Sequence, residues 1–346
     1  MSIPQPSISV IIPVYNSTKT IRYTLAALKN QIFSADEIII GYNPSKDETL
    51  AIIEEYSKIL NIKIIKFEKV VGPAEARNIC AAQTQSEWLA FVDSDCAPFE
   101  NWLEKIKELT IKINADCYTG PVIGYLPESV FDKYQNAFGL NIVAEDKLFN
   151  RYEIFKSFGH TANFIVKRKI FEKLQGFNPQ LFYAEDHDFC ARLLLSNNNY
   201  TLYFSNELVM RHIFRTDLKK FLHFVFFYNY AYIYLIRKYY KRFIIKFGNR
   251  IIVDFQTTKM PMLININNLS LKLIILVLLC IAISKLMIIP LILYLLKINT
   301  KLFLKFNKLS LCENYGQSYK FLLIYLLEEI IGTTGHLCGL LFNRKK

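Results

Sequence analysis

Apolar and polar positions follow two alternating patterns over the first third of the chain. Short β-branched or aromatic runs typical of strands cover Ile8–Ile12, Glu37–Ile40, Lys63–Phe67 and Trp88–Val92. Apolar residues at helical spacing cover Thr20–Asn30, Leu50–Leu60, Ala74–Gln83 and Glu100–Thr110. Strands and helices that alternate in this way predict an α/β fold, with a mostly parallel sheet and helices on both faces.

Polar residues cluster where each predicted strand ends, which is where ligands bind in sheets of this kind. These segments are Pro13–Ser17, Gly41–Thr49, Val70–Asn78 and Asp93–Pro98. Asp93 and Asp95 stand two residues apart, so both carboxylates could reach one hard cation such as Mg²⁺ or Mn²⁺. The alternative is that Asp95 caps the helix that follows.

The basic excess of the chain is confined to its last two fifths. The formal net charge is +12, yet residues 1–210 carry 21 basic and 25 acidic side chains. Residues 211–346 carry 21 basic and 5 acidic side chains and are also the most apolar part. Basic and apolar character together favour an anionic membrane surface as partner, and no nucleic acid. The seven cysteines are odd in number and include no C-x-x-C pair, which predicts reduced thiols.

Four motifs in order resemble the GT-A glycosyltransferases of family 2. They are SVIIPVYN at Ser9–Asn16, GPAEARN at Gly72–Asn78, FVDSDCAP at Phe91–Pro98, and the stretch Phe177–His212 with GFNPQLFYAEDHDFCARL. The resemblance covers about residues 7–215. It implies a GT-A nucleotide-diphospho-sugar transferase fold, a UDP- or GDP-linked sugar donor, a divalent Mn²⁺ or Mg²⁺ cofactor, and inversion at the transferred sugar.

The resemblance also assigns donor-site roles to individual residues. In chain order, Pro13 and Tyr15 line the nucleotide base, Arg77 faces the base or diphosphate, Asp93 contacts ribose or metal, Asp95 ligates the metal, and His212 completes the metal site. The guanidinium of Arg77 suits a diphosphate because its donors form a fixed fork. The plainer alternatives are a surface helix arginine for Arg77 and an interfacial histidine for His212.

The chain departs from the family after the second strand. The family commonly reads V-D-D-G-S-x-D-x-T there, whereas this chain places Tyr42 and Asn43 at the two acidic positions and retains Asp47 and Thr49. Asn43 can still donate or accept a hydrogen bond through its amide. The base, uracil or guanine, is therefore left open.

Acidic residues are densest at Glu185-Asp186-His187-Asp188, at the start of a predicted helix. A helix N-terminus stabilises acidic side chains, which is the structural alternative to a catalytic role. The resemblance assigns the catalytic base to Asp186 and acceptor orientation to Glu185. Asp188 is expected to pair with Arg192 at i+4. The Q-x-x-R-W motif of processive synthases is absent from the sequence, which favours single additions.

The chain divides into a predicted catalytic domain and a predicted helical, membrane-associated region. The first spans residues 1–215, with a nucleotide-sugar half of about 1–120 and an acceptor half of about 121–215. The second spans residues 216–346 and contains eleven Phe or Tyr residues between Phe221 and Phe243. The apolar segment 273–296 is long enough to span a bilayer, but a re-entrant hairpin or an interfacial position is also open. An interfacial helix is predicted over residues 319–342.

These observations predict a membrane-associated inverting glycosyltransferase at the cytoplasmic face of the cell membrane. Its acceptor would be a hydroxyl of a lipid-linked or cell-surface glycan. A polyprenyl-phosphate hexose transferase is one alternative, because an ionised acceptor needs no base. A catalytically silent nucleotide- or glycan-binding membrane protein is another, motivated by Tyr42 and Asn43. The oligomeric state is not predicted.

Overall fold

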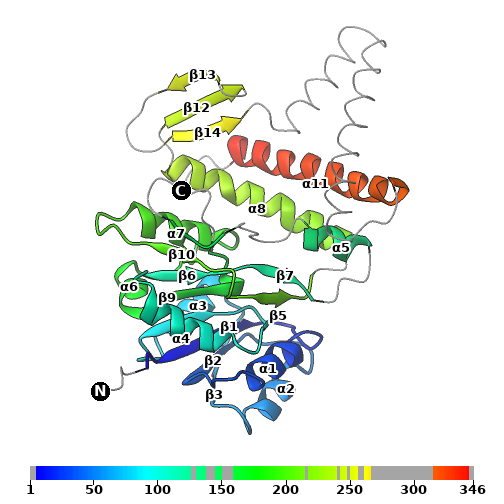
Figure 1. The fold of residues 1–346 in the computed structure, drawn as a ribbon. Helices are drawn as coiled ribbons and strands as arrows, with labels where there is room; N and C mark the ends of the chain where they lie inside the picture. The colour runs from blue at the N-terminus through cyan, green and yellow to red at the C-terminus, as the bar shows by residue number, and fades with distance from the viewer. Residues whose placement is uncertain are drawn as a thin grey trace. The chain divides into compact units, whose positions relative to one another are not determined.

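The fold is described from a computed structural model (Figure 1). It describes residues 5–125, 130–137, 145–149, 159–214, 217–239, 242–247, 250–255, 261–265 and 315–342. The chain forms two compact units. The first consists of Met1–Leu126 with Gly139–Phe214, and the second of Pro127–Phe138 with Arg215–Lys346.

An eight-stranded sheet in the order β3-β2-β1-β4-β9-β6-β10-β8 forms the centre of the first unit. Its strands are β1 (Ile8–Val14), β2 (Glu37–Tyr42), β3 (Ile62–Lys66), β4 (Trp88–Phe91), β6 (Cys117–Thr119), β8 (Lys147–Phe149), β9 (Phe164–Lys167) and β10 (Leu202–Phe204). Strands β3, β2, β1 and β4 are parallel, as the sequence predicts, and so are β6 and β10. However, β9 runs antiparallel to both β4 and β6, and β8 runs antiparallel to β10.

The sheet is therefore mixed, but six of its eight strands run in one direction, as predicted, and only β9 and β8 run against them. The cause is the insertion of β9 between two strands that precede it in sequence. In the β4–β9 pair, Phe91 lies opposite Phe164 and Trp88 lies opposite Lys167, so β4 pairs with a strand from the later half of the unit. Hydrophobic periodicity along one segment carries no information about which distant strand will pair with it.

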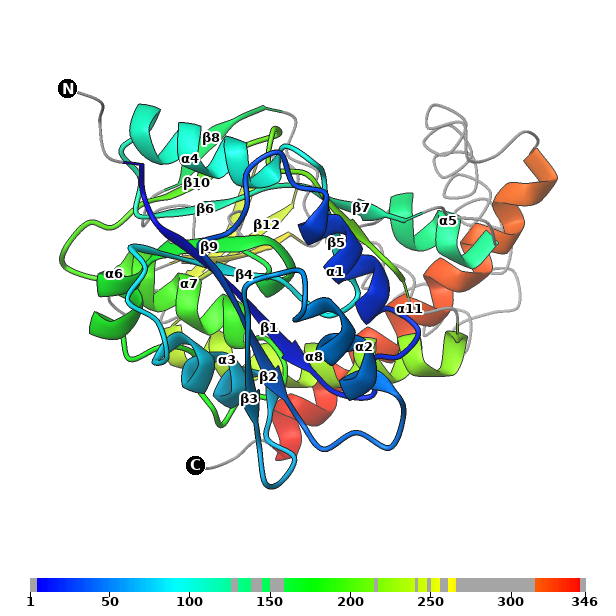
Figure 2. The same ribbon diagram turned by 90° about the horizontal axis from the view of Figure 1, so that it is seen from below.

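Helices cover both faces of the sheet, as predicted (Figure 2). They are α1 (Ile21–Lys29), α2 (Thr49–Tyr56), α3 (Pro73–Ala81), α4 (Trp102–Lys112), α6 (Arg168–Lys173) and α7 (Glu185–Leu195). Alternate residues of β1, such as Val10 and Ile12, pack in one buried cluster with α1, α2 and α4. The opposite face of β2 meets α3, where a Cβ on Gly41 would lie 2.8 Å from the sulfur of Cys80.

A second, three-stranded sheet positions the candidate site. Strand β11 (Met210–His212) lies between β5 (Cys96–Pro98) and β7 (Val122–Gly124). It pairs antiparallel with β5, with Met210 opposite Pro98 and His212 opposite Cys96. The end of the first unit is thereby brought back to the segment that follows Asp95.

The second unit contains helices α5 (Val130–Ala137), α8 (Leu218–Tyr239) and α11 (Tyr315–Phe342), and strands β12 (Arg242–Phe247), β13 (Arg250–Phe255) and β14 (Pro261–Asn265). Helices α8 and α11 pack closely at Gly335. A Cβ added there would lie only 2.4 Å from the carbonyl oxygen of Phe226. The three strands form one sheet in the order β13-β12-β14. The region predicted to be helical therefore contains strands as well as helices, and the β-branched runs RFIIKF and RIIVDF favour these strands.

No helix within the described ranges is long and apolar enough to cross a membrane. The predicted apolar segment 273–296 lies outside the described residues. The predicted helix at 319–342 is found as α11, four residues longer at its start, and its location in a membrane interface stays a prediction.

Candidate active site

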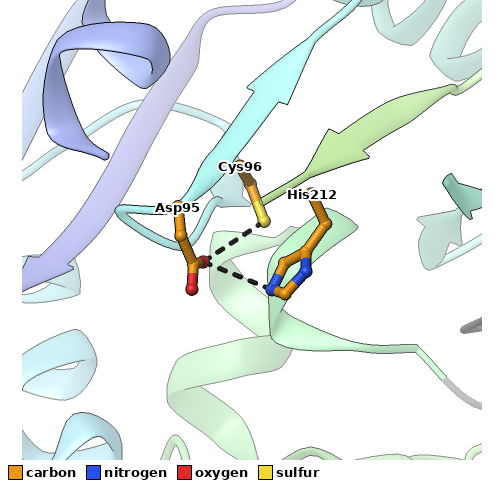
Figure 3. A group of neighbouring side chains, drawn as sticks. All are labelled: Asp95, Cys96 and His212. Carbon is orange, nitrogen blue, oxygen red and sulfur yellow. Dashed lines mark hydrogen bonds and ion pairs between the residues drawn. The ribbon is translucent and has the colours of Figure 1, made fainter. Parts of the chain in front are cut away.

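Asp95, Cys96 and His212 bring three possible metal-ligand atoms together (Figure 3). The Oδ1 atom of Asp95 lies 3.4 Å from Nε2 of His212 and 3.7 Å from the sulfur of Cys96. The register of β5 and β11 explains this arrangement: residues directly opposite in an antiparallel pair project their side chains from the same face. The backbone bond from Ile213 N to Asp95 O, 2.9 Å long, continues the pairing beyond His212.

The donor set of this cluster fits a divalent cation. One carboxylate oxygen, one imidazole nitrogen and one sulfur lie within 4.8 Å of one another, and a set of these three atoms suits a borderline transition metal such as Zn²⁺. Cys96 and His212 are buried, whereas Asp95 is partly exposed and open to a ligand. Burial, and then the negative charges of Asp95 and Asp93, raise the pKa of the Cys96 thiol well above its usual value.

Asp93 does not join this cluster and belongs instead to a buried ion-pair network around Arg77. The Nη2 of Arg77 donates to Oδ1 of Asp93 at 2.5 Å, and its Nη1 donates to Oε1 of Glu185 at 2.7 Å. Arg77 is only 3% exposed, so the alternative of a surface helix arginine is wrong. Its guanidinium also lies 5.9 Å from the ring centre of Phe177.

Arg77 therefore joins the segment after β4 to the start of α7. Its predicted contact with the nucleotide base or diphosphate stays a prediction, as does the predicted contact of Asp93 with ribose or metal. The side-chain Nε of Arg77 is buried and has no hydrogen-bond partner among the described residues. Above the pKa of Glu185, which burial raises to about 7, two carboxylates on one guanidinium leave the network with one surplus negative charge.

The acidic helix α7 begins at Glu185, directly after Ala184, whose φ of 61° turns the chain into the helix. Oδ1 of Asp186 accepts a hydrogen bond from the backbone N–H of His187 at 2.8 Å. Its Oδ2 lies 3.5 Å from Nδ1 of His160. The predicted pair of Asp188 with Arg192 is confirmed, with Nε donating to Oδ2 at 2.8 Å.

The two candidate acceptor-side acids differ in their protonation. Burial alone would raise the pKa of Asp186, but His187 and His160 together hold it well below its usual range. Burial raises the pKa of Glu185 to about 7, against the opposing effect of Arg77. Burial also lowers the pKa of His187 to about 4. Asp186 is therefore ionised at neutral pH, which is the state that a catalytic base requires.

The residues predicted to contact the base lie at the ends of β1 and β2. Pro13 is paired with Gly41 across these strands, and Tyr15 is about half exposed. Asn43 is buried, and its Oδ1 accepts a hydrogen bond from the backbone of Val71 at 2.8 Å.

Tyr42 and Asn43, which stand where the family commonly has two acidic residues, accept hydrogen bonds from the backbone of neighbouring segments. Besides the bond from Asn43 to Val71, the hydroxyl of Tyr42 accepts from the backbone N–H of Ser45 at 3.2 Å. Hydrogen bonds from Thr49 and Thr18 outweigh the effect of burial on Asp47 and lower its pKa to about 2. Asp47 is therefore a fixed anion of this loop.

Sequence reasoning missed Cys96 and His160. Cys96 directly follows the D-x-D motif, so its position was visible, but its pairing with His212 depends on the distant strand β11. His160 stands in Gly159–Asn163, just before β9, and no local pattern marks it as a neighbour of Asp186.

The fold and this arrangement of acidic side chains define a GT-A-like α/β domain with a mixed sheet and flanking helices. A structure similar over 99% of this chain is the mannosyltransferase PcManGT from Pyrobaculum calidifontis, in complex with GDP-Man and Mn²⁺. The TM-score is 0.54 at 14% identity, and the match covers 89% of that protein, so the likeness concerns the fold.

Residues 9–175 match the model of the family Glycosyl transferase family 2. The resemblance seen in the motifs is thereby confirmed over residues 9–175, which are just under half of the chain. The fourth motif, Phe177–His212, lies beyond the matched residues.

Similar curated proteins are glycosyltransferases as well. Glycosyltransferase AglE of Haloferax volcanii is 27% identical over 212 residues, which are 60% of this chain and 67% of that protein. Poly(ribitol-phosphate) beta-N-acetylglucosaminyltransferase TarS of Staphylococcus aureus is 40% identical over 90 residues, which are 25% of this chain. The chain matches only 16% of the length of TarS.

Proposed function

We propose that the chain is a metal-dependent glycosyltransferase that moves one sugar, with inversion, from a UDP- or GDP-linked donor to a hydroxyl group. The observation that carries this proposal is the convergence of Asp95 and His212, with the acidic start of α7 joined to Asp93 through Arg77. A cation ligand pair and an ionised carboxylate are the two parts that a single displacement needs.

On the donor side, Asp95 and His212 would hold a Mn²⁺ or Mg²⁺ ion. Such an ion supplies positive charge that offsets the negative charge developing on the departing diphosphate. Arg77 neutralises Asp93 and so reduces the repulsion between that carboxylate and the phosphates. Pro13, Tyr15 and Asn43 would line the nucleotide base.

On the acceptor side, Asp186 would remove the proton of the attacking hydroxyl. The acceptor oxygen forms a bond to the anomeric carbon as the bond from that carbon to the diphosphate breaks, and the proton moves to the Asp186 carboxylate. His160 and the backbone N–H of His187 fix the orientation of this carboxylate. Glu185, held by Arg77, would orient the acceptor.

The donor class in this proposal rests on the relatives as well as on the site. PcManGT is described with GDP-Man, and TarS is named as an N-acetylglucosaminyltransferase. A GDP-linked mannose and a nucleotide-linked N-acetylglucosamine are therefore both candidate donors here. The acceptor in this proposal is a lipid-linked or cell-surface glycan.

The basic second unit supports a location at the cytoplasmic face of the cell membrane. Residues 211–346 carry a net charge of +16 from 21 basic and 5 acidic side chains, which would attract anionic lipids. Flotation of the full-length protein with anionic vesicles tests this. Protein that stays bound in high salt supports burial of apolar residues, because exposed charge pairs are screened beyond about 8 Å at physiological salt. Protein that never floats contradicts the membrane proposal.

The proposed activity is tested by screening UDP- and GDP-sugars for hydrolysis by the purified protein, with Mn²⁺, with Mg²⁺ and with excess chelator. We expect release of UDP or GDP from one donor class only in the presence of metal. Full activity in excess chelator, or release from no donor in any condition, would contradict the proposal. A Glu55→Gln variant, which changes an exposed carboxylate of α2, serves as the matched control.

A further inference from the structure

Cys96 places a sulfur atom beside the two side chains that the proposed function assigns to the metal. Its thiol donates to Oδ1 of Asp95 at 3.7 Å, and this is the same oxygen that lies 3.4 Å from Nε2 of His212 (Figure 3). The donor atoms of all three residues lie within 4.8 Å of one another. Because Cys96 and His212 are opposite each other in the β5–β11 register, backbone pairing fixes the sulfur on this face.

The separations are those expected for atoms that share one ion. Tetrahedral zinc sites have Zn–N and Zn–O distances of about 2.0–2.2 Å and Zn–S distances of about 2.3 Å. Such a site sets its oxygen and nitrogen ligands about 3.4 Å apart, and its oxygen and sulfur ligands about 3.6 Å apart. The observed values of 3.4 Å and 3.7 Å are close to both, and the sulfur and Nε2 lie within 4.8 Å of each other, so the three side chains are compatible with one shared ion.

The surroundings of Cys96 also favour a ligand over an unrelated core thiol. The residue is fully buried within β5, yet its sulfur faces a carboxylate that is about one-third exposed. Cys117, in contrast, is equally buried in β6 and belongs to no comparable cluster among the described residues. These two cysteines form a matched pair for testing the role of the sulfur.

We propose that Cys96 is a third, thiolate ligand of the metal site and that it gives this site a preference for thiophilic divalent cations, such as Zn²⁺, Cd²⁺ and Co²⁺, over Mg²⁺. The inference rests on the proposed function only in locating the donor metal at Asp95 and His212. On binding, the S–H bond of Cys96 breaks, a sulfur–metal bond forms, and the proton passes to solvent. Thiolate ligands select soft and borderline cations, whereas Mg²⁺ prefers oxygen.

The test is a Cd²⁺ titration of the reduced full-length protein, followed by the ultraviolet charge-transfer absorption of cadmium thiolates. We expect the first equivalent of Cd²⁺ to produce this absorption in the wild type and in Cys117→Ser, and not in Cys96→Ser. Zn²⁺ affinity should fall at least about tenfold in Cys96→Ser, while Mg²⁺ affinity changes by less than about threefold. Equal absorption in Cys96→Ser and the wild type would overturn the proposal.

A measurement on the wild type keeps the proposal testable if Cys96→Ser fails to fold. X-ray absorption of the protein loaded with one equivalent of Zn²⁺ should show a sulfur neighbour at about 2.3 Å. A first shell of nitrogen and oxygen alone would overturn the proposal.

The two proposals fail in distinguishable ways. Metal-dependent sugar transfer without a cadmium–sulfur signal leaves the proposed function standing and removes Cys96 as a ligand. A Cys96-dependent signal in a protein that turns over no nucleotide sugar retains the metal site and contradicts the proposed function.

Discussion

Asp93 and Asp95 are two residues apart, yet their carboxylates have opposite surroundings. Asp93 pairs with the buried guanidinium of Arg77, which also binds Glu185. Asp95 faces His212 and Cys96, and no lysine or arginine among the described residues pairs with it. The first carboxylate is neutralised within the protein, whereas the second retains its capacity to bind a cation. The D-x-D motif thus divides into one residue that joins elements of the fold and one that is available to a ligand.

Removing the Asp95 carboxylate should have the largest effect on activity. In Asp95→Ala the proposed cation site loses its partly exposed oxygen ligand, so turnover should fall by at least about 10²–10³-fold, together with metal-dependent nucleotide binding. Steady-state kinetics and calorimetric titration with UDP and GDP measure the two effects. The exposed control Glu55→Gln should match the wild type, and unchanged turnover in Asp95→Ala would place the metal elsewhere.

Asp186→Asn should leave the donor side intact and remove the proton acceptor. Transfer to the acceptor should fall by about 10²–10⁴-fold while donor binding stays within about twofold. A kinetic comparison under saturating donor separates these quantities. If transfer survives at near wild-type rates, the acceptor is already ionised, as in the polyprenyl-phosphate alternative.

Arg77→Met should destabilise the fold, because it leaves the buried carboxylate of Glu185 and the partly buried carboxylate of Asp93 without their partner. We expect a loss of about 3–5 kcal/mol in the free energy of unfolding, measured by urea titration. The exposed pair of Arg22 and Glu55, at 3.0 Å, provides the matched control. Arg22→Met should leave the free energy of unfolding nearly unchanged, because solvent screens this exposed pair. Similar losses of unfolding free energy in Arg77→Met and Arg22→Met would show that the Arg77 network stabilises the fold no more than an exposed ion pair does.

The smallest expected effect is on the pH dependence of stability. The pKa of Glu185 is raised to about 7 from the ordinary value of 4.5, so the folded state binds this proton more tightly than the unfolded state. This group therefore lowers stability as pH rises from about 4.5 to 7. Relative to the wild type, Glu185→Gln should show a shallower decline in unfolding free energy over that window. A steeper decline in the variant would contradict this assignment.

The local elements of the first unit follow from the sequence, whereas its long-range pairings do not. Strands β1 to β4 and helices α1 to α4 lie within a few residues of their predicted positions, because their apolar periods are regular. The antiparallel insertion of β9 and the pairing of β5 with β11 depend on segments far apart in the chain. The apolar pattern of a strand restricts which of its faces is buried, but it does not identify the distant strand that pairs with it.

In the candidate site, too, local features could be predicted from the sequence, whereas contacts between distant segments could not. Acidic character at the ends of β4 and at the start of α7 could be read directly from the sequence, as could the i+4 pair of Asp188 and Arg192. The burial of Arg77 between two carboxylates, and the meeting of Cys96 with His212, required the folded chain. In the second unit, β12, β13 and β14 contain β-branched residues that favour strands. The prediction of helices there relied instead on the aromatic and basic composition of the region.

The most direct test of the contrast between Asp95 and the Arg77 network is a Mn²⁺ titration in the presence of UDP or GDP, with the free ion followed by electron paramagnetic resonance. The wild type should bind one Mn²⁺ per chain with one of the two nucleotides. Asp95→Ala should lose this binding. Glu185→Gln changes a carboxylate that pairs with Arg77 and leaves Asp95, Cys96 and His212 in place, so it should retain Mn²⁺ binding within about threefold. Retained Mn²⁺ binding in Asp95→Ala, with loss in Glu185→Gln, would contradict the account.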